Sequence, residues 1–75
     1  MKAIIWSKTP CPYCVQAKNL LIAKGIEYEE RDVTKGNWTV EQLKEAIPGA
    51  TSVPRIFIDD KYVGGLADLR TYLGG

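Results

Sequence analysis

Residues 2–14 read KAIIWSKTPCPYC, an apolar run followed by a short polar loop and a pair of cysteines. The run Lys2–Trp6 predicts a buried strand, and Ser7–Pro10 predicts the loop that follows it. Pro12 suits the first position of a helix, because its missing N–H would have no partner there. The stretch therefore predicts a strand, a loop and a helix, with both cysteines at the start of the helix.

Cys11 and Cys14 are the 2 cysteines of the chain, and their spacing is about one helical turn. A thiolate in the first turn of a helix is stabilised by unpaired backbone N–H groups and by the positive end of the helix dipole. We therefore expect Cys11 to be the attacking thiolate. A second thiol three residues later can resolve the mixed disulfide that the first one forms, and this role is expected of Cys14.

Two structural uses of this pair fit poorly. A structural zinc site usually has four Cys or His ligands, whereas the chain has no histidine and no third cysteine. A disulfide that closes so short a loop stabilises a fold by only about 2 kcal/mol before strain is subtracted. The pair is therefore interpreted as redox-active, and no metal site is expected.

The first helix and the strand after it follow from the same patterns. Cys14, Ala17 and Leu21 share one helical face, and Gly25 is a good terminator for that helix. Residues 26–33 predict a second strand with its charged side chains on one side. A strand, helix and strand of this length imply parallel pairing through a right-handed crossover.

A second helix is predicted after residue 38. Thr39 is placed as its N-cap with Gln42 three residues later, while Trp38 and Leu43 are placed to form a hydrophobic staple. Trp38 is therefore interpreted as a structural clamp. Pro48-Gly49 is expected to end this helix.

The remaining residues predict a hairpin and a third helix. The strands are expected at Arg55–Ile58 and Lys61–Val63, joined at Asp59-Asp60. Gly64-Gly65 then precedes a helix from about Leu66 to Leu73, which Gly74-Gly75 is expected to end. The element order βαβ-α-ββα predicts an α/β fold. In it, a four-stranded mixed sheet is flanked by three helices, which are divided between its two faces. The active cysteine is expected at the carboxyl end of the first strand.

Composition narrows the function. Seventy-five residues are expected to form a single domain, residues 1–75. The net charge is +1, so no broad field favours nucleic acid or an anionic membrane surface. No stretch approaches the roughly 20 apolar residues of a membrane span, and the apolar run at the N-terminus is too short for a signal peptide. A cytoplasmic protein is expected, and in that compartment a disulfide is usually transient and catalytic.

Three separated segments resemble those of a dithiol glutaredoxin. They are the active-site segment Lys8–Cys14, the segment Ser52-Val53-Pro54, and the glycine pair with an acidic helix start in Gly64–Leu69. The resemblance covers nearly all of the chain and implies the thioredoxin fold. The implied activity is glutathione-dependent reduction of protein disulfides and of protein–glutathione mixed disulfides.

The resemblance also implies a binding site for glutathione as co-substrate. It implies a cis bond before Pro54, which leaves the backbone of Val53 free to pair with a substrate. The implied glutathione-binding residues are Lys8, Tyr13, Val53, Pro54, Gly65, Leu66, Ala67 and Asp68.

Glutathione has two carboxylates and one ammonium, and each group has a candidate partner. Lys8 is placed to reach the glycyl carboxylate and to favour the thiolate, and a plain surface lysine is the less favoured alternative. The backbone N–H groups of Ala67 and Asp68 suit the γ-glutamyl carboxylate. Asp68 could accept from the ammonium, or be an ordinary acid at the start of a helix.

Several points stay open at the level of sequence. Glu41, Gln42 or Lys44 could supply a further contact to the glycyl carboxylate, and Arg55 could be a contact or a solvated strand residue. One rival interpretation is a redoxin of the same fold that is reduced by thioredoxin reductase and serves as electron donor, for example to ribonucleotide reductase. Another is an iron–sulfur cluster carrier, against which Pro12 counts. The expected partners are glutathione and disulfide or glutathionylated proteins, and the protein is expected to be a monomer.

Overall fold

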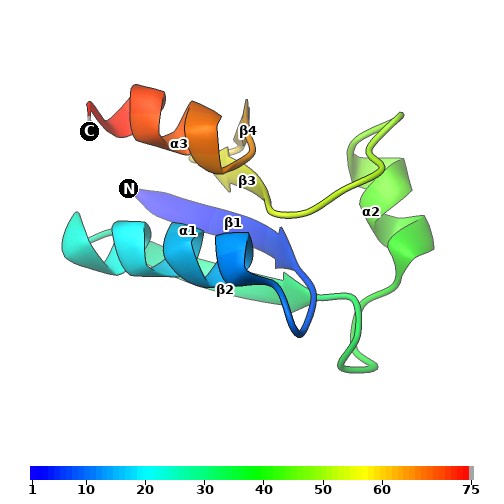
Figure 1. Ribbon diagram of the computed structural model, residues 1–75. Helices are drawn as coiled ribbons and strands as arrows, with labels where there is room; N and C mark the ends of the chain where they lie inside the picture. Colours follow the sequence, from blue (N-terminus) through cyan, green and yellow to red (C-terminus); the bar gives the residue numbers. More distant parts are fainter. Residues whose placement is uncertain (75) are drawn as a thin grey trace.

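The computed structural model describes residues 1–74 and contains four strands and three helices. In chain order they are β1 (Lys2–Ser7), α1 (Pro12–Ala23), β2 (Glu27–Asp32), α2 (Val40–Ala46), β3 (Arg55–Ile58), β4 (Lys61–Gly64) and α3 (Leu66–Leu73). The strands form one sheet in the order β2-β1-β3-β4, in which β1 is parallel to β2 and antiparallel to β3. The mixed sheet and the element order are those predicted (Figure 1).

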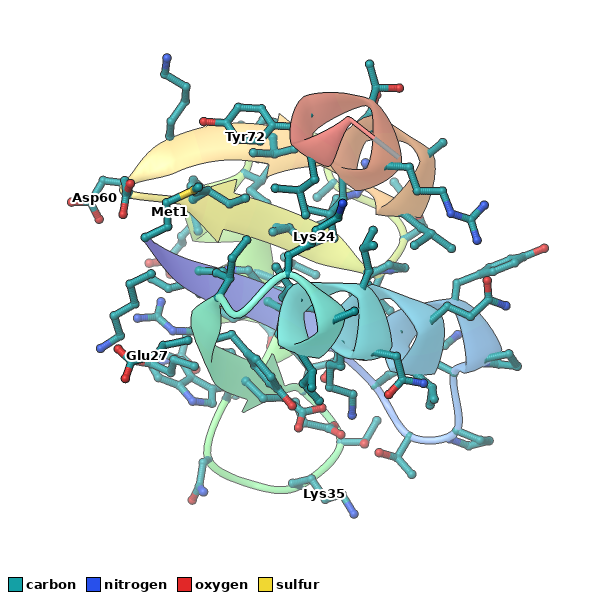
Figure 2. All side chains as sticks on the ribbon, turned by 90° about the vertical axis from the view of Figure 1, so that its left-hand side faces the viewer. Met1, Lys24, Glu27, Lys35, Asp60 and Tyr72 are labelled. Carbon is teal, nitrogen blue, oxygen red and sulfur yellow. A yellow bond between two sulfur atoms is a disulfide. The ribbon has the colours of Figure 1, made fainter. Side chains whose placement is uncertain are left out.

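The helices cover both faces of the sheet. Figure 2 shows α1 and α3 on the same side of the sheet, where they enclose the larger core cluster. Its buried residues are Ala3, Ile5, Ala17, Leu21, Ile26, Ile56, Ile58 and Leu69. On the opposite face, Leu43 of α2 packs in a smaller cluster with Trp6 and Ala50. The two clusters hold β1 and β3 at the centre of the fold.

Helix α1 begins where the sequence predicts. Cys11 is its N-cap and Pro12 is its first residue, while Cys14, Ala17 and Leu21 are its buried residues. Gly25 follows the helix with a φ of +70°, a conformation that glycine adopts without strain. Because α1 follows β1 after a loop of four residues, both cysteines lie at the carboxyl end of β1.

The expectation that the charges of the second strand lie on one side is wrong. Glu30 forms an ion pair with Lys18 of α1, whereas Arg31 lies over the rings of Trp6 and Trp38 on the opposite face. The reason is that β2 is an edge strand. The margins of the sheet leave room for charged side chains on both of its faces.

Helix α2 has the capping arrangement that the sequence predicts. The hydroxyl of Thr39 accepts a hydrogen bond from the backbone N–H of Gln42 at 3.1 Å, and the Gln42 side chain accepts from the backbone N–H of Thr39 at 2.8 Å. Trp38 packs against the cluster that contains Leu43, and its ring lies edge-on to Trp6 with centroids 5.4 Å apart. Trp38 is thus part of the packing that anchors α2.

The hairpin and the last helix also follow the prediction. Asp59 and Asp60 have φ values of 50° and 67°, as a tight turn between β3 and β4 requires. Strand β4 includes Gly64, one residue more than predicted. Gly74 caps α3 in the left-handed conformation, and Gly75 lies outside the described residues.

Candidate active site

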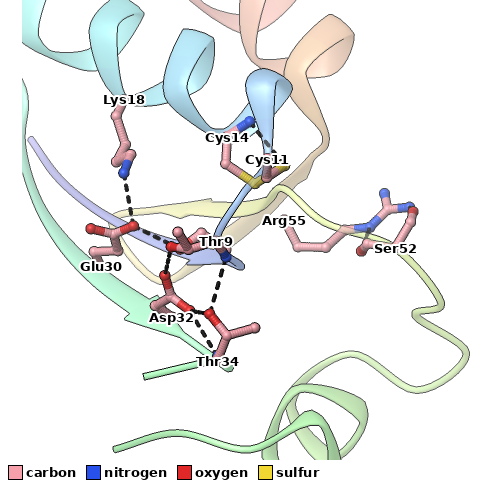
Figure 3. Close-up of a disulfide and its surroundings, with 10 residues drawn as sticks. Thr9, Cys11, Cys14, Lys18, Glu30, Asp32, Thr34, Ser52 and Arg55 are labelled. Carbon is pink, nitrogen blue, oxygen red and sulfur yellow. Dashed lines mark hydrogen bonds and ion pairs between the residues drawn. A yellow bond between two sulfur atoms is a disulfide. The ribbon is translucent and has the colours of Figure 1, made fainter. Parts of the chain in front are cut away.

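The two cysteines form a disulfide whose Cα atoms are 5.2 Å apart (Figure 3). Cys11 is 8% exposed and Cys14 is 1% exposed, so Cys11 is the more accessible residue of the pair. The backbone N–H of Cys14 donates a hydrogen bond to that sulfur at 3.2 Å. The same N–H would stabilise a thiolate on Cys11 once the disulfide is reduced.

A polar cluster holds the loop that leads to Cys11. The hydroxyl of Thr9 donates to the Asp32 carboxylate at 2.6 Å, and the backbone N–H of Thr9 donates to the Thr34 hydroxyl at 3.0 Å. Asp32 also accepts from the backbone N–H of Thr34 at 2.7 Å and from its hydroxyl. Thr9 is thus bonded through its main chain and its side chain to the end of β2, two residues before the reactive sulfur (Figure 3).

The pKa of the Asp32 carboxyl lies below its ordinary value of 3.8. Burial acts to raise this pKa, but the hydrogen bonds from Thr34 and Thr9 act to lower it and prevail, with help from the charge of Lys35. Asp32 is 8% exposed and is therefore held as a buried carboxylate in the folded protein.

A second carboxylate on β2 is held in a similar way. Burial acts to raise the pKa of Glu30, but the ammonium of Lys18 and the buried hydroxyl of Ser7 together lower it below its ordinary value of 4.5. Lys18 and Ser7 donate to the same oxygen of Glu30, at 2.9 Å and 2.8 Å. These bonds tie the middle of α1 to the end of β1 through β2.

A groove of about 270 Å³ lies on the α2 side of the segment that precedes β3. Its lining includes Lys8, Lys44 and the segment Thr51–Val53, together with apolar side chains below them. Three residues of the second helix were candidates for a contact with the glycyl carboxylate, and of these Lys44 lines this groove. Glu41 and Gln42 do not, and Gln42 is bonded to Thr39 in the helix cap.

A second groove, of about 330 Å³, lies on the α3 side of the same segment. It is lined by Tyr13, Ser52, Val53, Pro54, Arg55, Gly65, Leu66, Ala67 and Arg70. Val53 lines both grooves, and Lys8 and Tyr13 stand on either side of Cys11 in the sequence. The structure therefore gathers seven of the eight expected binding residues into two grooves that share Val53.

The Val53–Pro54 peptide bond is cis, as the resemblance implied. Within residues 1–74, the backbone N–H and C=O of Val53 have no hydrogen-bond partner. The Thr9–Pro10 bond is also cis, although no sequence pattern predicts it.

Asp68, the eighth expected residue, lies at the start of α3 beside the second groove. Its Oδ2 accepts a hydrogen bond from the backbone N–H of Gly65 at 3.1 Å, and it is the acidic residue of the first helical turn. A Cβ at Gly64, whose φ is +125°, would collide with this carboxylate. Asp68 therefore caps α3, and the turn itself accounts for Gly64.

Sequence reasoning missed several residues around the cysteines. The sequence pattern assigned Asp32 only to the end of a strand and Arg70 only to the last helix, and it gave Thr34 no role. One sequence pattern could have identified Asp32. An aspartate at the end of a strand with a threonine two residues later favours a hydrogen bond from the threonine backbone N–H to the carboxylate. No local pattern identifies Arg70, because it reaches the groove from an element far along the chain.

Two structural features are absent from the described residues. Among residues 1–74, no group of three or more His, Cys, Asp or Glu side chains is placed to hold a metal ion. None of the helices in this part of the chain has the length and apolar character needed to cross a lipid bilayer.

The pair of cysteines at the carboxyl end of β1, on a four-stranded mixed sheet, has the geometry of a dithiol site on a thioredoxin-like fold. The glutaredoxin family model matches residues 3–63, which include the cysteines and the Val53–Pro54 bond. The chain belongs to the glutaredoxin family. Glutaredoxins are thiol–disulfide oxidoreductases of the thioredoxin fold, so this activity and this fold are those of the present glutaredoxin.

Individual relatives agree with this placement. Glutaredoxin 1 of Rickettsia prowazekii (strain Madrid E) is 45% identical over 69 residues, which are 88% of this chain and 70% of that protein. The structure of reduced Escherichia coli glutaredoxin has a TM-score of 0.81 and 31% identity, covering 99% of this chain and 94% of that one. A buckwheat glutaredoxin–glutathione complex has a TM-score of 0.79 and 26% identity, covering 96% of this chain and 69% of that one.

Proposed function

We propose that this glutaredoxin uses glutathione to reduce protein disulfides and mixed disulfides between proteins and glutathione. The supporting observation is the position of the Cys11 sulfur. It lies at the N-cap of α1 and accepts from the backbone N–H of Cys14, and Cys11 is the more exposed residue of the pair. Residues close to it in sequence, Lys8 and Tyr13, line the two grooves.

For a glutathionylated protein the reaction has two exchange steps. The Cys11 thiolate attacks the glutathione sulfur, the bond between glutathione and the protein breaks, and the protein thiolate leaves and takes up a proton from water. Glutathione now remains on Cys11. The thiolate of a second glutathione attacks that mixed disulfide, releases glutathione disulfide and restores the Cys11 thiolate.

For a protein disulfide, Cys14 takes the place of the second glutathione. Cys11 first forms a mixed disulfide with one substrate sulfur and releases the other as a thiolate. Cys14 then attacks the sulfur of Cys11, releases the second substrate thiolate and leaves the intramolecular disulfide that the structure contains. Because Cys14 is 1% exposed, it reaches Cys11 and not the substrate.

The two grooves supply partners for the charged groups of glutathione. Lys8 and Lys44 offer cations to the glycyl carboxylate in the first groove. At the start of α3, the backbone N–H groups of Ala67, which lines the second groove, and of Asp68 beside it suit the γ-glutamyl carboxylate. The carboxylate of Asp68 is the acceptor for the ammonium.

The middle of glutathione would then lie between these two ends. The free backbone groups of Val53, beside Pro54, pair with the cysteinyl residue as an added strand would. Tyr13, which is 63% exposed, offers a ring face to the second groove, and Gly65 and Leu66 also line it.

The test is a pair of coupled assays. NADPH consumption is followed with glutathione and glutathione reductase, and separately with thioredoxin reductase, using the mixed disulfide of cysteine and glutathione as substrate. We expect rapid turnover in the first assay and little in the second. Turnover supported only by thioredoxin reductase would refute the proposal and favour an electron-donor redoxin instead.

A further inference from the structure

The linings of the two grooves contain cations and no acids. Lys8 and Lys44 line the first groove, Arg55 and Arg70 line the second, and neither lining contains an Asp or Glu. The chain as a whole has a net charge of only +1. The positive charge is therefore concentrated around the segment that ends in Val53 and is not a property of the whole surface.

None of these four cations is neutralised within the described part of the chain. The ion pairs among residues 1–74 join Lys18 to Glu30 and Arg31 to Glu29, on β2. Arg55 donates to the carbonyl of Ser52 at 3.1 Å, to its hydroxyl at 2.8 Å and to the Tyr62 hydroxyl at 3.3 Å. These partners hold the guanidinium in place but carry no charge.

Arg70 is in a similar state. Its guanidinium donates to the side-chain oxygen of Gln16 at 3.1 Å, a neutral contact between α3 and α1. Arg55 and Arg70 therefore line the same groove from two elements, each oriented by neutral acceptors. Such preorganised guanidinium groups lose little further freedom when a carboxylate binds.

Glutathione does not account for this excess. Under the proposed function its glycyl carboxylate is matched by the two lysines and its γ-glutamyl carboxylate by the N–H groups at the start of α3. The two arginines of the second groove then have no anionic partner. Both guanidinium groups are therefore available to another negatively charged group, and the remaining molecule in the reaction is the protein substrate.

We propose that Arg55 and Arg70 recognise acidic side chains that flank the target cysteine of a protein substrate. The inference rests on the proposed function and specifies its substrate class. A protein segment that replaces glutathione beside Val53 is extended, and a segment in mixed disulfide with glutathione is joined to it through the sulfur. In both cases the residues next to the target cysteine lie close to the second groove. Arginine binds a carboxylate through two parallel N–H bonds, which suits this recognition. Unpaired cations also speed the approach of an acidic partner.

The experiment compares peptides that differ only in charge. Each has one cysteine in mixed disulfide with glutathione, flanked on both sides by Glu, Gln or Lys. For the unmodified protein we expect kcat/KM to be roughly three- to tenfold higher for the Glu peptide than for the Gln peptide, because the guanidinium groups are partly exposed. The Lys peptide should be the poorest substrate. The preference should shrink as salt rises from about 0.02 M to about 0.5 M.

Substitutions then locate the preference. Arg70→Gln should remove most of it, and Arg70→Glu should favour the Lys peptide over the Glu peptide. Arg55→Gln also removes the bonds to Ser52, so Arg55→Lys is measured beside it as the variant that keeps the charge. Lys61→Gln, an exposed change on β4 outside both grooves, is the matched control and should leave the ratio unchanged.

A single-turnover arm separates this inference from the proposed function. Reduced protein is mixed with the same peptides carrying a methyl disulfide in place of glutathione. Cys11 and Cys14 reduce these peptides without glutathione. Equal rates for the Glu, Gln and Lys peptides, or a preference that survives both Arg70 variants, would overturn the inference. Failure of glutathione to support turnover, with the charge preference intact in single turnover, would overturn only the proposed function.

Discussion

Asp32→Asn is expected to destabilise the fold through the loop that leads to Cys11. The carboxylate of Asp32 accepts from the Thr9 hydroxyl at 2.6 Å, from the Thr34 backbone N–H at 2.7 Å and from the Thr34 hydroxyl. Hydrogen bonds to a charged group contribute about 1.5–3 kcal/mol each. The amide of asparagine keeps the shape of the side chain and part of its hydrogen bonding. We therefore expect the free energy of unfolding at pH 7 to fall by about 2 kcal/mol.

The assay is urea unfolding followed by the fluorescence of Trp6 and Trp38, which pack together on the face that α2 covers. In a domain of this size, about 2 kcal/mol corresponds to a melting temperature lower by about 8–16 °C. Glu45→Gln on the exposed side of α2 is the matched control and should change the free energy of unfolding by less than about 0.5 kcal/mol.

The pH dependence tests the cause of the effect. The pKa of Asp32 in the folded protein lies below its ordinary value of 3.8, so its contribution is fully present above that pH. It is lost as the pH falls through the lower folded pKa, because the carboxylate must then be protonated. The stability difference between the unmodified protein and Asp32→Asn should therefore be constant from pH 7 to about pH 5 and narrow below about pH 4.

Thr9 supplies a second measurement of the same cluster. Thr9→Ser keeps the hydroxyl that Asp32 accepts, whereas Thr9→Val removes it and leaves the carboxylate one donor short. We expect Thr9→Ser to leave the free energy of unfolding nearly unchanged and Thr9→Val to lower it by about 1.5 kcal/mol. A gap between the unmodified protein and Asp32→Asn that stays the same down to pH 3, or equal costs for the two Thr9 variants, would refute the reasoning.

Four further outcomes are expected. Cys11→Ser should abolish thiol exchange, whereas Cys14→Ser should still remove glutathione from proteins; similar residual activity in both would show that the nucleophile is assigned wrongly. Asp68→Ala should lower kcat/KM for glutathionylated substrates about tenfold and, by removing the cap of α3, cost about 1 kcal/mol of stability; an equal loss with a disulfide that lacks the γ-glutamyl group would mean that the residue is only structural. Lys44→Gln should raise KM for glutathione severalfold, whereas Gln42→Ala should lower stability alone; equal effects on KM would argue against the assignment of Lys44. Metal analysis of the purified protein should find no stoichiometric iron or zinc; a brown dimer with iron would favour a cluster carrier.

The local elements were accessible from sequence because each depends on neighbours a few residues apart. The Thr39 and Gln42 cap, the turn at Asp59-Asp60 and the helix that begins at Pro12 are all found where the patterns predict them. Their determinants are backbone hydrogen-bonding needs and the periodicity of apolar side chains, both of which are written along the chain.

The charges of β2 show where this reasoning stops. Alternation predicts which side chains share a face, but the position of a strand in its sheet decides whether a face is covered. The residue pattern of β2 predicts a strand with one charged side, whereas the edge position of β2 leaves charges on both sides. Burial of Asp32, and with it the low pKa of that carboxyl, follows from packing against the loop before Cys11.

The sequence by itself determined the order of strands and helices, the reactive pair at the start of α1 and most of the residues expected around it. Only the tertiary structure placed Lys44, and neither Glu41 nor Gln42, in the lining of the first groove, and turned the carboxylate of Asp68 back to the N–H of Gly65. It also brought Arg70 into one groove with Arg55. The physical reason is distance along the chain. A helical or extended period reports which face a residue occupies, whereas the neighbours of that face are set by the packing of elements that lie many residues away.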